Sequence, residues 1–162
     1  MPLSSICGVV ATKKIRPAGN APSRSKTKTS ASRGSRAKLV VTRVVPTLRM
    51  FDIAKAREFY LDYLGFTVDF EHRFHDGAPL YMGISRDGLV LHLSEHHGDG
   101  SPGVHFTIEM TGVDDLHREL HAKNYRYMNP GIVKTEWGTR DLGVIDPVGN
   151  RLTFSERITK SS

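Results

Sequence analysis

The sequence predicts an α+β fold in which two βαβββ modules form a cupped mixed sheet around a cavity. Three observations lead to this prediction: two segments have helical periodicity, each is followed by short strand-like runs, and the same order recurs after 60 residues. One module on its own would leave one face of its sheet bare. We therefore expect the modules to pair, within one chain or between the chains of a dimer.

The first module begins with a strand-like segment and continues into an amphipathic helix. The run LVVTRVV over Leu39–Val45 is rich in β-branched residues and predicts a strand, and the strand that leads into the helix covers Val44–Met50. Asp52 is a suitable N-cap for the helix, and Gly65 stands where a glycine commonly ends one. Between them, residues at helical spacing predict one buried face: Ala56, Phe59, Tyr60, Tyr63 and Leu64.

Three strands complete the first module. They are predicted at Thr67–His72, Leu80–Ser85 and Leu89–Ser94. The sequence Arg-Asp-Gly at positions 86–88 separates the last two and is typical of a hairpin turn, so these two strands should be antiparallel neighbours.

The second module repeats this order. A strand is predicted over His105–Met110 and a helix over Val113–Lys123, with Leu116 and Leu120 facing inward. Asn124 takes the place that Gly65 has in the first module, because asparagine tolerates the left-handed conformation. The remaining strands are predicted at Tyr125–Met128, Lys134–Glu136, Asp141–Asp146 and Arg151–Ser155.

Charge divides the chain into a basic N-terminal segment and an acidic body. Residues 1–44 contain ten Lys/Arg and no acidic residue, whereas residues 45–158 contain twelve Lys/Arg and seventeen Asp/Glu, a formal charge of −5. We predict a disordered basic N-terminal extension over 1–43, a folded domain over 44–158 and a short tail over 159–162. The extension has three explanations: a solvated segment or mis-assigned start codon, a transit peptide, or a nucleic-acid contact. An acidic domain repels phosphates, so nucleic-acid recognition is not expected of the folded part.

Cysteine content and hydropathy restrict the class of protein further. Cys7 is the only cysteine, which excludes an intrachain disulfide framework and a thiolate zinc site. No apolar run approaches the roughly 18 residues that a membrane-spanning helix needs. We expect a soluble cytoplasmic protein without membrane contact, or an organellar one if the extension is a transit peptide.

Two segments of the chain resemble a known family. PTLRMFDIAKAREFYLDYLGFTVDFE resembles the first module of the bleomycin-resistance proteins, and WGTRDLGVIDPVGNRLTF resembles the end of their second module. These proteins belong to the vicinal-oxygen-chelate superfamily, together with glyoxalases and dioxygenases. The motif DPVGN at Asp146–Asn150 is a hallmark of that superfamily, and it also suits a tight turn into the last strand. The resemblance extends from Val44 onward and implies a glyoxalase-like fold.

The resemblance also implies where a metal would be bound. Metal-using members of the superfamily carry ligands at four positions, which correspond here to Val45, His92, His105 and Thr153. Valine has no donor atom and threonine is a weak ligand, so the set for a catalytic zinc or iron ion is incomplete. We therefore expect no cofactor and no catalytic residue. The alternative is a divalent metal on His92 and His105; otherwise these imidazoles line a cavity and form hydrogen bonds.

In the resembling drug-binding proteins, a dimer sequesters a cationic, metal-chelating antibiotic through aromatic stacking and acidic residues. The matching positions and the two imidazoles make up the predicted ligand-binding set: Asp69, Phe70, Phe74, His92, His105, Trp137 and Gly138. Asp69 and Phe70 alternate on a strand, so we expect them to face opposite sides of the sheet. Three of these residues have a structural alternative to ligand binding. For Phe70 and Trp137 it is packing in the core, and for Asp69 it is the role of an ordinary exposed carboxylate.

Two further positions bear on the ligand and on assembly. Thr107 and Glu109 stand where the resembling proteins carry ligand-stacking aromatics, so the ligand can differ from bleomycin itself. Pro46 matches a proline that accompanies strand exchange between subunits, which predicts a homodimer. Three hypotheses remain: non-enzymatic sequestration of a bleomycin-type antibiotic, a metal-dependent glyoxalase-type lyase or dioxygenase, and a small-ligand-binding module unrelated to antibiotics.

Overall fold

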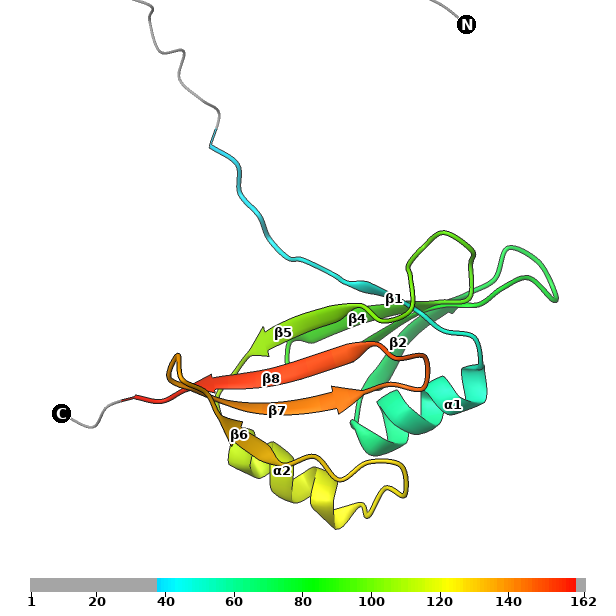
Figure 1. Cartoon of the computed structure of the whole chain (residues 1–162). Helices are drawn as coiled ribbons and strands as arrows, with labels where there is room; N and C mark the ends of the chain where they lie inside the picture. Colours follow the sequence, from blue (N-terminus) through cyan, green and yellow to red (C-terminus); the bar gives the residue numbers. More distant parts are fainter. Residues whose placement is uncertain (1–37, 160–162) are drawn as a thin grey trace, which may run out of the picture. The chain divides into compact units, whose positions relative to one another are not determined.

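Two four-stranded mixed sheets form the framework of the folded part of the chain (Figure 1). The computed structural model describes residues 38–159, so the predictions for residues 1–37 and 160–162 lie outside the described residues. The first module contains β1 (Thr47–Arg49), α1 (Ile53–Arg57), β2 (Thr67–His72), β3 (Tyr81–Arg86) and β4 (Leu89–Ser94). The second contains β5 (His105–Glu109), α2 (Val113–Ala122), β6 (Ile132–Lys134), β7 (Thr139–Ile145) and β8 (Arg151–Arg157). The predicted α+β class is confirmed.

The two sheets have the same topology. Their strand orders are β1-β4-β3-β2 and β5-β8-β7-β6, and in each the first strand pairs in parallel with the last. Leu48 lies opposite Leu93 in the first sheet, and Ile108 lies opposite Phe154 in the second. The helices of the two modules begin at the predicted spacing of 60 residues, at Ile53 and Val113, and the equivalent strands follow in the same order. The repeat is therefore structural as well as sequential.

The helix of the first module has the predicted buried face but a different hydrogen-bonding pattern. Asp52 caps it by accepting a hydrogen bond from the Lys55 amide at 3.0 Å. After Arg57 the α-helix gives way to a π-helical stretch over Glu58–Tyr63, where the Leu64 amide donates to the Phe59 carbonyl five residues back at 2.9 Å. The spacing of apolar residues cannot distinguish these two patterns. The five residues of the predicted face are all buried.

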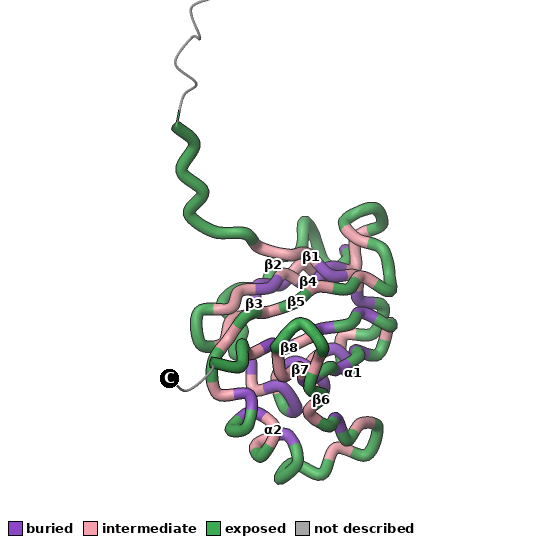
Figure 2. The backbone as a smooth tube through the Cα atoms, turned by 60° about the vertical axis from the view of Figure 1, so that its left-hand side comes forward, coloured by how far each residue is buried: buried purple, intermediate pink, exposed green. Residues whose placement is uncertain are grey.

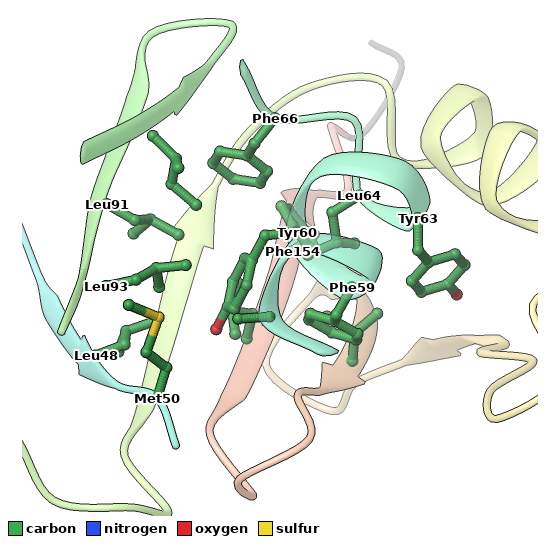
Figure 3. Close-up of a cluster of buried hydrophobic side chains, with 14 of the residues drawn as sticks. Leu48, Met50, Phe59, Tyr60, Tyr63, Leu64, Phe66, Leu91, Leu93 and Phe154 are labelled. Atoms are coloured by element: carbon green, nitrogen blue, oxygen red, sulfur yellow. The ribbon is translucent and has the colours of Figure 1, made fainter. Parts of the chain in front are cut away.

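A single hydrophobic core joins the two modules. Figure 3 shows side chains of the π-helical stretch packed with core residues of both sheets. Leu48 and Leu93 lie on strands of the first sheet, and Phe154 lies on β8 of the second. In the second module, α2 has a buried face and an exposed face (Figure 2). Helices therefore cover one face of each sheet, and the other face of each sheet points outward.

Hydrogen bonds between buried polar groups also cross from one module to the other. The Tyr60 hydroxyl donates to Asp146 Oδ2 at 2.8 Å, and the Asn150 side chain donates to the Arg49 carbonyl at 3.2 Å. Asp146 and Asn150 both belong to the DPVGN turn, which therefore connects the π-helical stretch and β1 to the second module. No helix in residues 38–159 is long and apolar enough to cross a membrane.

The predicted strand over Leu39–Val45 is wrong. Residues 38–46 have no regular secondary structure, and β1 is limited to Thr47–Arg49. In the parallel register Thr47 lies opposite His92, so Leu89, the first residue of β4, corresponds to position 44. Residues before position 44 therefore have no partner in β4. A strand-forming composition is not sufficient where no neighbouring strand is present.

Two strands of the second module were also misplaced. Tyr125–Met128 forms a turn instead of a strand, and its first ring stacks on Tyr63 at a centroid distance of 4.4 Å. The strand predicted over Lys134–Glu136 lies two residues earlier, as β6. Its end is set by a tight turn in which the Gly138 amide donates to the Thr135 carbonyl. Tertiary stacking and turn geometry thus override local strand propensity here.

An ion pair between the modules predicts a pH effect on stability. Glu119 on α2 accepts hydrogen bonds from Arg86 at the end of β3. Burial raises the pKa of the Glu119 carboxyl, but its hydrogen bonds with Arg86 and Lys123 outweigh burial and lower the pKa below 4.5. Because the folded pKa lies below the unfolded one, the pair stabilises the fold above pH 4.5 and loses this effect as the pH falls.

The free energy of unfolding of Glu119→Gln is therefore expected to fall less than that of the wild type as the pH is lowered into the acid range. We expect a loss of no more than about 1 kcal/mol at neutral pH, since the pair is partly exposed to solvent. Urea unfolding followed by circular dichroism between pH 3 and pH 7 measures this difference. If the variant loses stability with falling pH as steeply as the wild type does, the ion pair of Glu119 with Arg86 is not the source of the effect.

Candidate functional site

The outward face of the first sheet carries a cluster of three rings. Core residues alternate along β3 and β4, so Tyr81, Gly83 and His92 point to the opposite, open face. Phe70 reaches this face from β2 and lies directly over Gly83, its partner in the register. A side chain larger than hydrogen at Gly83 would occupy the space of the Phe70 ring. The glycine therefore allows the ring to lie close to the backbone of the sheet.

The rings of this cluster contact one another at ordinary aromatic distances. Phe70 meets His92 edge-on with centroids 5.4 Å apart and is nearly parallel to Tyr81 at 6.3 Å. The Tyr81 hydroxyl and His92 Nδ1 share a hydrogen bond of 2.7 Å. This bond fixes the orientation of the imidazole and leaves Nε2 available. We call Phe70, Tyr81, Gly83 and His92 the ring cluster.

The prediction that Asp69 and Phe70 face opposite sides of the sheet is wrong. The pairing of β2 with β3 shifts between Val68 and Phe70, which marks a β-bulge at Asp69. The Asp69 carboxylate accepts a hydrogen bond from the Ser85 hydroxyl at 2.7 Å, and Ser85 lies on the same face as Gly83. The extra residue thus brings a carboxylate and a ring to one face. With 44% of its surface exposed, Phe70 is not a core residue.

Phe74 extends this surface at one end. It lies in the loop between β2 and β3 and is 76% exposed. Its ring contacts His72 at 5.0 Å and His96 at 5.5 Å, edge-on in both cases. The predicted position of an aromatic outside the core is therefore confirmed, while a contact with ligand stays a prediction.

The other predicted residues lie on the second sheet. His105 is at the start of β5, on the outward face, where its Nε2 and the Thr153 hydroxyl are 2.9 Å apart. Trp137 is in the turn between β6 and β7 and is 76% exposed, which excludes the core-packing alternative. Gly138 follows with a φ of +85°, a conformation that favours glycine, so its role in this turn is conformational.

The predicted set therefore falls into two groups, one on each sheet. Asp69, Phe70, Phe74 and His92 belong to the first, and His105, Trp137 and Gly138 to the second. Within residues 38–159, no hydrogen bond or aromatic contact joins a member of one group to a member of the other. Both outward faces are thus available to a ligand or a second chain.

The residues at the superfamily's metal positions do not fit a metal centre within this chain. Val45 has no donor atom, and the Thr153 hydroxyl is engaged with His105. His92 lies on the other sheet and is bonded to Tyr81. Over the described part of the chain, no three His, Cys, Asp or Glu side chains come together.

Sequence reasoning missed two members of the ring cluster, Tyr81 and Gly83. A signal for Gly83 was present, because a glycine inside the strand-like run YMGIS is typical of a close approach to the backbone. Tyr81 stands two residues before it and therefore on the same face. Their contact with Phe70 depends on the bulge, which no residue pattern indicated.

Comparison with known proteins places these features in context. A family model described as "Glyoxalase superfamily protein" matches residues 29–161. The bleomycin resistance protein of Geobacillus stearothermophilus is 28% identical over 132 residues, which cover 70% of this chain and 96% of that protein. The same identity and coverage are found for the bleomycin resistance protein of Staphylococcus aureus.

Solved structures give a matching result. The bleomycin-binding protein of Streptomyces verticillus, solved with copper(II)-bleomycin, is 27% identical with a TM-score of 0.56 and covers 76% of this chain and 100% of its own. A glyoxalase-related enzyme from Clostridium phytofermentans has a TM-score of 0.60 at 22% identity, with the same coverage, and it shares the fold.

Proposed function

This chain belongs to the glyoxalase superfamily, and from this premise we propose that it binds a small cationic or metal-chelated antibiotic of the bleomycin type and releases it unchanged. The similarity to bleomycin resistance proteins confirms the resemblance seen in the sequence. The observation that carries the proposal is the ring cluster with Asp69 beside it on an open sheet face. Sequestration by such binding would confer resistance to the antibiotic.

The chemistry of the ring cluster suits this ligand class. An exposed ring held at fixed orientation can stack on a planar heterocycle, and each aromatic pair contributes about 0.5–1.5 kcal/mol beyond the area it buries. The Asp69 carboxylate and the net charge of −5 over residues 45–158 attract cations. The free nitrogen of His92 can hydrogen-bond a polar group of the ligand.

We propose further that two chains complete the binding site. The ring cluster covers one side of a ligand, and in each chain the outward face of the second sheet is also uncovered. In a homodimer, the first sheet of one chain can face the second sheet of its partner. His105 and Trp137 would then lie opposite Phe70. Sedimentation equilibrium that finds only monomers at ligand-binding concentrations would contradict this arrangement.

The proposed binding involves no chemical step. Two of the superfamily's four metal positions are Val45 and Thr153, and the two imidazoles are each engaged in a hydrogen bond. A metal-dependent lyase or dioxygenase is the competing function. Stoichiometric metal retained through purification, and lost from His92→Ala and His105→Ala alike, would favour that competitor.

Fluorescence of the single tryptophan tests the binding proposal directly. We expect copper-bleomycin to change Trp137 emission saturably at micromolar concentration, with one binding site for each ring cluster. Metal-free bleomycin titrated in parallel separates drug binding from quenching by copper. Asp69→Asn should weaken binding several-fold, whereas Tyr127→Ala, which removes an exposed ring outside the ring cluster, should not. No change in emission up to millimolar drug would overturn the proposal.

A further inference from the structure

Helix α2 carries two histidines side by side, of which His117 is partly buried and His121 is exposed. His117 and His121 are four residues apart, one helical turn, and their ring centroids are 4.8 Å apart with an interplanar angle of 57°. The adjacent face of the helix is buried through Val113, Leu116 and Leu120, so His117 lies at the edge of the buried face. Since α2 covers the core face of the second sheet, the pair lies away from the outward face that carries His105.

The separation of the two rings fits chelation of one metal ion. An ion bound to an imidazole nitrogen at 2.0–2.1 Å lies roughly 3.2 Å from the ring centroid, so two imidazoles at about 90–109° have centroids about 4.5–5.2 Å apart. The observed 4.8 Å lies within this range. Only rotations of the two side chains are then needed to direct one nitrogen of each ring at a shared ion.

The surroundings of the pair favour a cation, and the exposed His121 gives solvent access to it. His121 is in the last turn of α2, where the helix dipole is negative. It also lines a cavity of about 510 Å³ together with Asn124, Tyr125 and Tyr127. Asp114, one turn before His117, is paired with Arg140 and is not free to join them. An ion held here would keep open positions for water or for donor atoms of another molecule.

We propose that His117 and His121 form a binding site for a divalent transition-metal ion on α2, with Cu²⁺ bound more tightly than Zn²⁺. Imidazole pairs suit copper, nickel and zinc, and copper forms the strongest complexes of the three. This site is separate from the superfamily's metal positions and does not depend on the proposed drug binding.

Competition with a chromophoric chelator measures the affinity of the full chain for Cu²⁺. We expect His117→Ala and His121→Ala each to weaken the tightest site at least about tenfold, because a chelate becomes a single ligand. Electron paramagnetic resonance of the copper complex should show two equivalent imidazole nitrogens in the wild type and one in either variant. His97→Ala, which removes an exposed histidine elsewhere, should leave both measurements unchanged.

A register shift gives the sharpest control. Combining His121→Ala with Ala122→His keeps the number of histidines but moves one imidazole about 100° around the helix. Both positions are exposed, so the fold should be retained, and circular dichroism checks this. The shifted variant should lose the tight site as completely as His121→Ala. If it binds copper as tightly as the wild type, the ion is held by other histidines and the proposal is wrong.

Discussion

Replacing Asp146 with alanine is expected to lower the free energy of unfolding by roughly 3–5 kcal/mol, because it leaves several buried donors without an acceptor. The carboxylate accepts hydrogen bonds from the Tyr60 hydroxyl at 2.8 Å, the Asn150 amide at 2.7 Å and the Asn150 side chain at 2.8 Å. Tyr60 and Asn150 are both buried, so water cannot replace the lost acceptor at no cost. Urea unfolding followed by far-UV circular dichroism measures the change.

The expected effect is large because this carboxylate joins two modules. Asn150 also accepts a hydrogen bond from the Val104 amide and donates one to the Arg49 carbonyl, so the loss of Asp146 frees a residue that positions β5 and β1. Tyr60→Phe is the matched control, since it removes one hydrogen bond and should cost about 1–2 kcal/mol. Equal effects of the two substitutions would mean that Asp146 does not organise the turn.

The same network predicts an alkaline effect. Burial, and then the negative charge of Asp146, raise the pKa of the Tyr60 hydroxyl well above 10.0. Because the folded pKa exceeds the unfolded one, the tyrosine stabilises the fold fully below pH 10 and less as the pH rises beyond it. Tyr60→Phe should therefore lose less stability between pH 9 and pH 11 than the wild type does.

Elements whose pattern depends on local spacing were predicted well. The helical faces around Phe59 and Leu116, the N-cap at Asp52 and the hairpin turn at Asp87-Gly88 all depend on residues close in sequence. The hairpin has positive φ at both turn residues, as its Asp-Gly sequence indicates. The 60-residue repeat then relates one module to the other.

Features that depend on distant partners could not be predicted. Leu39–Val45 has a strand-forming composition without a strand to pair with, and Tyr125 is held by stacking on Tyr63, 62 residues earlier. The bulge at Asp69 has no marker of its own, since neither glycine nor proline stands there. The extra residue in the bulge decides whether the side chains of Asp69 and Phe70 lie on the same face of the sheet. For this reason periodicity assigned the two side chains to opposite faces of the sheet.

A substitution at Gly83 is expected to weaken drug binding, because Phe70 lies against this glycine. A Cβ atom at Gly83 would lie 2.8 Å from Phe70 Cδ1, closer than two carbon atoms can approach, so Gly83→Ala must displace the ring from the sheet. Phe70 is partly exposed, and its ring can move outward without unfolding the protein. We expect the affinity for copper-bleomycin to fall about tenfold, equivalent to one good ring contact, while stability changes by less than about 1 kcal/mol.

A double-mutant cycle separates displacement of the ring from other effects of the methyl group. Phe70→Ala should weaken binding by a similar factor, because it removes the ring that Gly83→Ala displaces. Adding Gly83→Ala to Phe70→Ala should then cost nothing further, since no ring remains to be moved. Isothermal titration calorimetry of the four proteins measures all the terms. If the two losses are additive, the methyl group acts on the ligand or the sheet directly, and the ring cluster is not the surface that Phe70 presents to the drug.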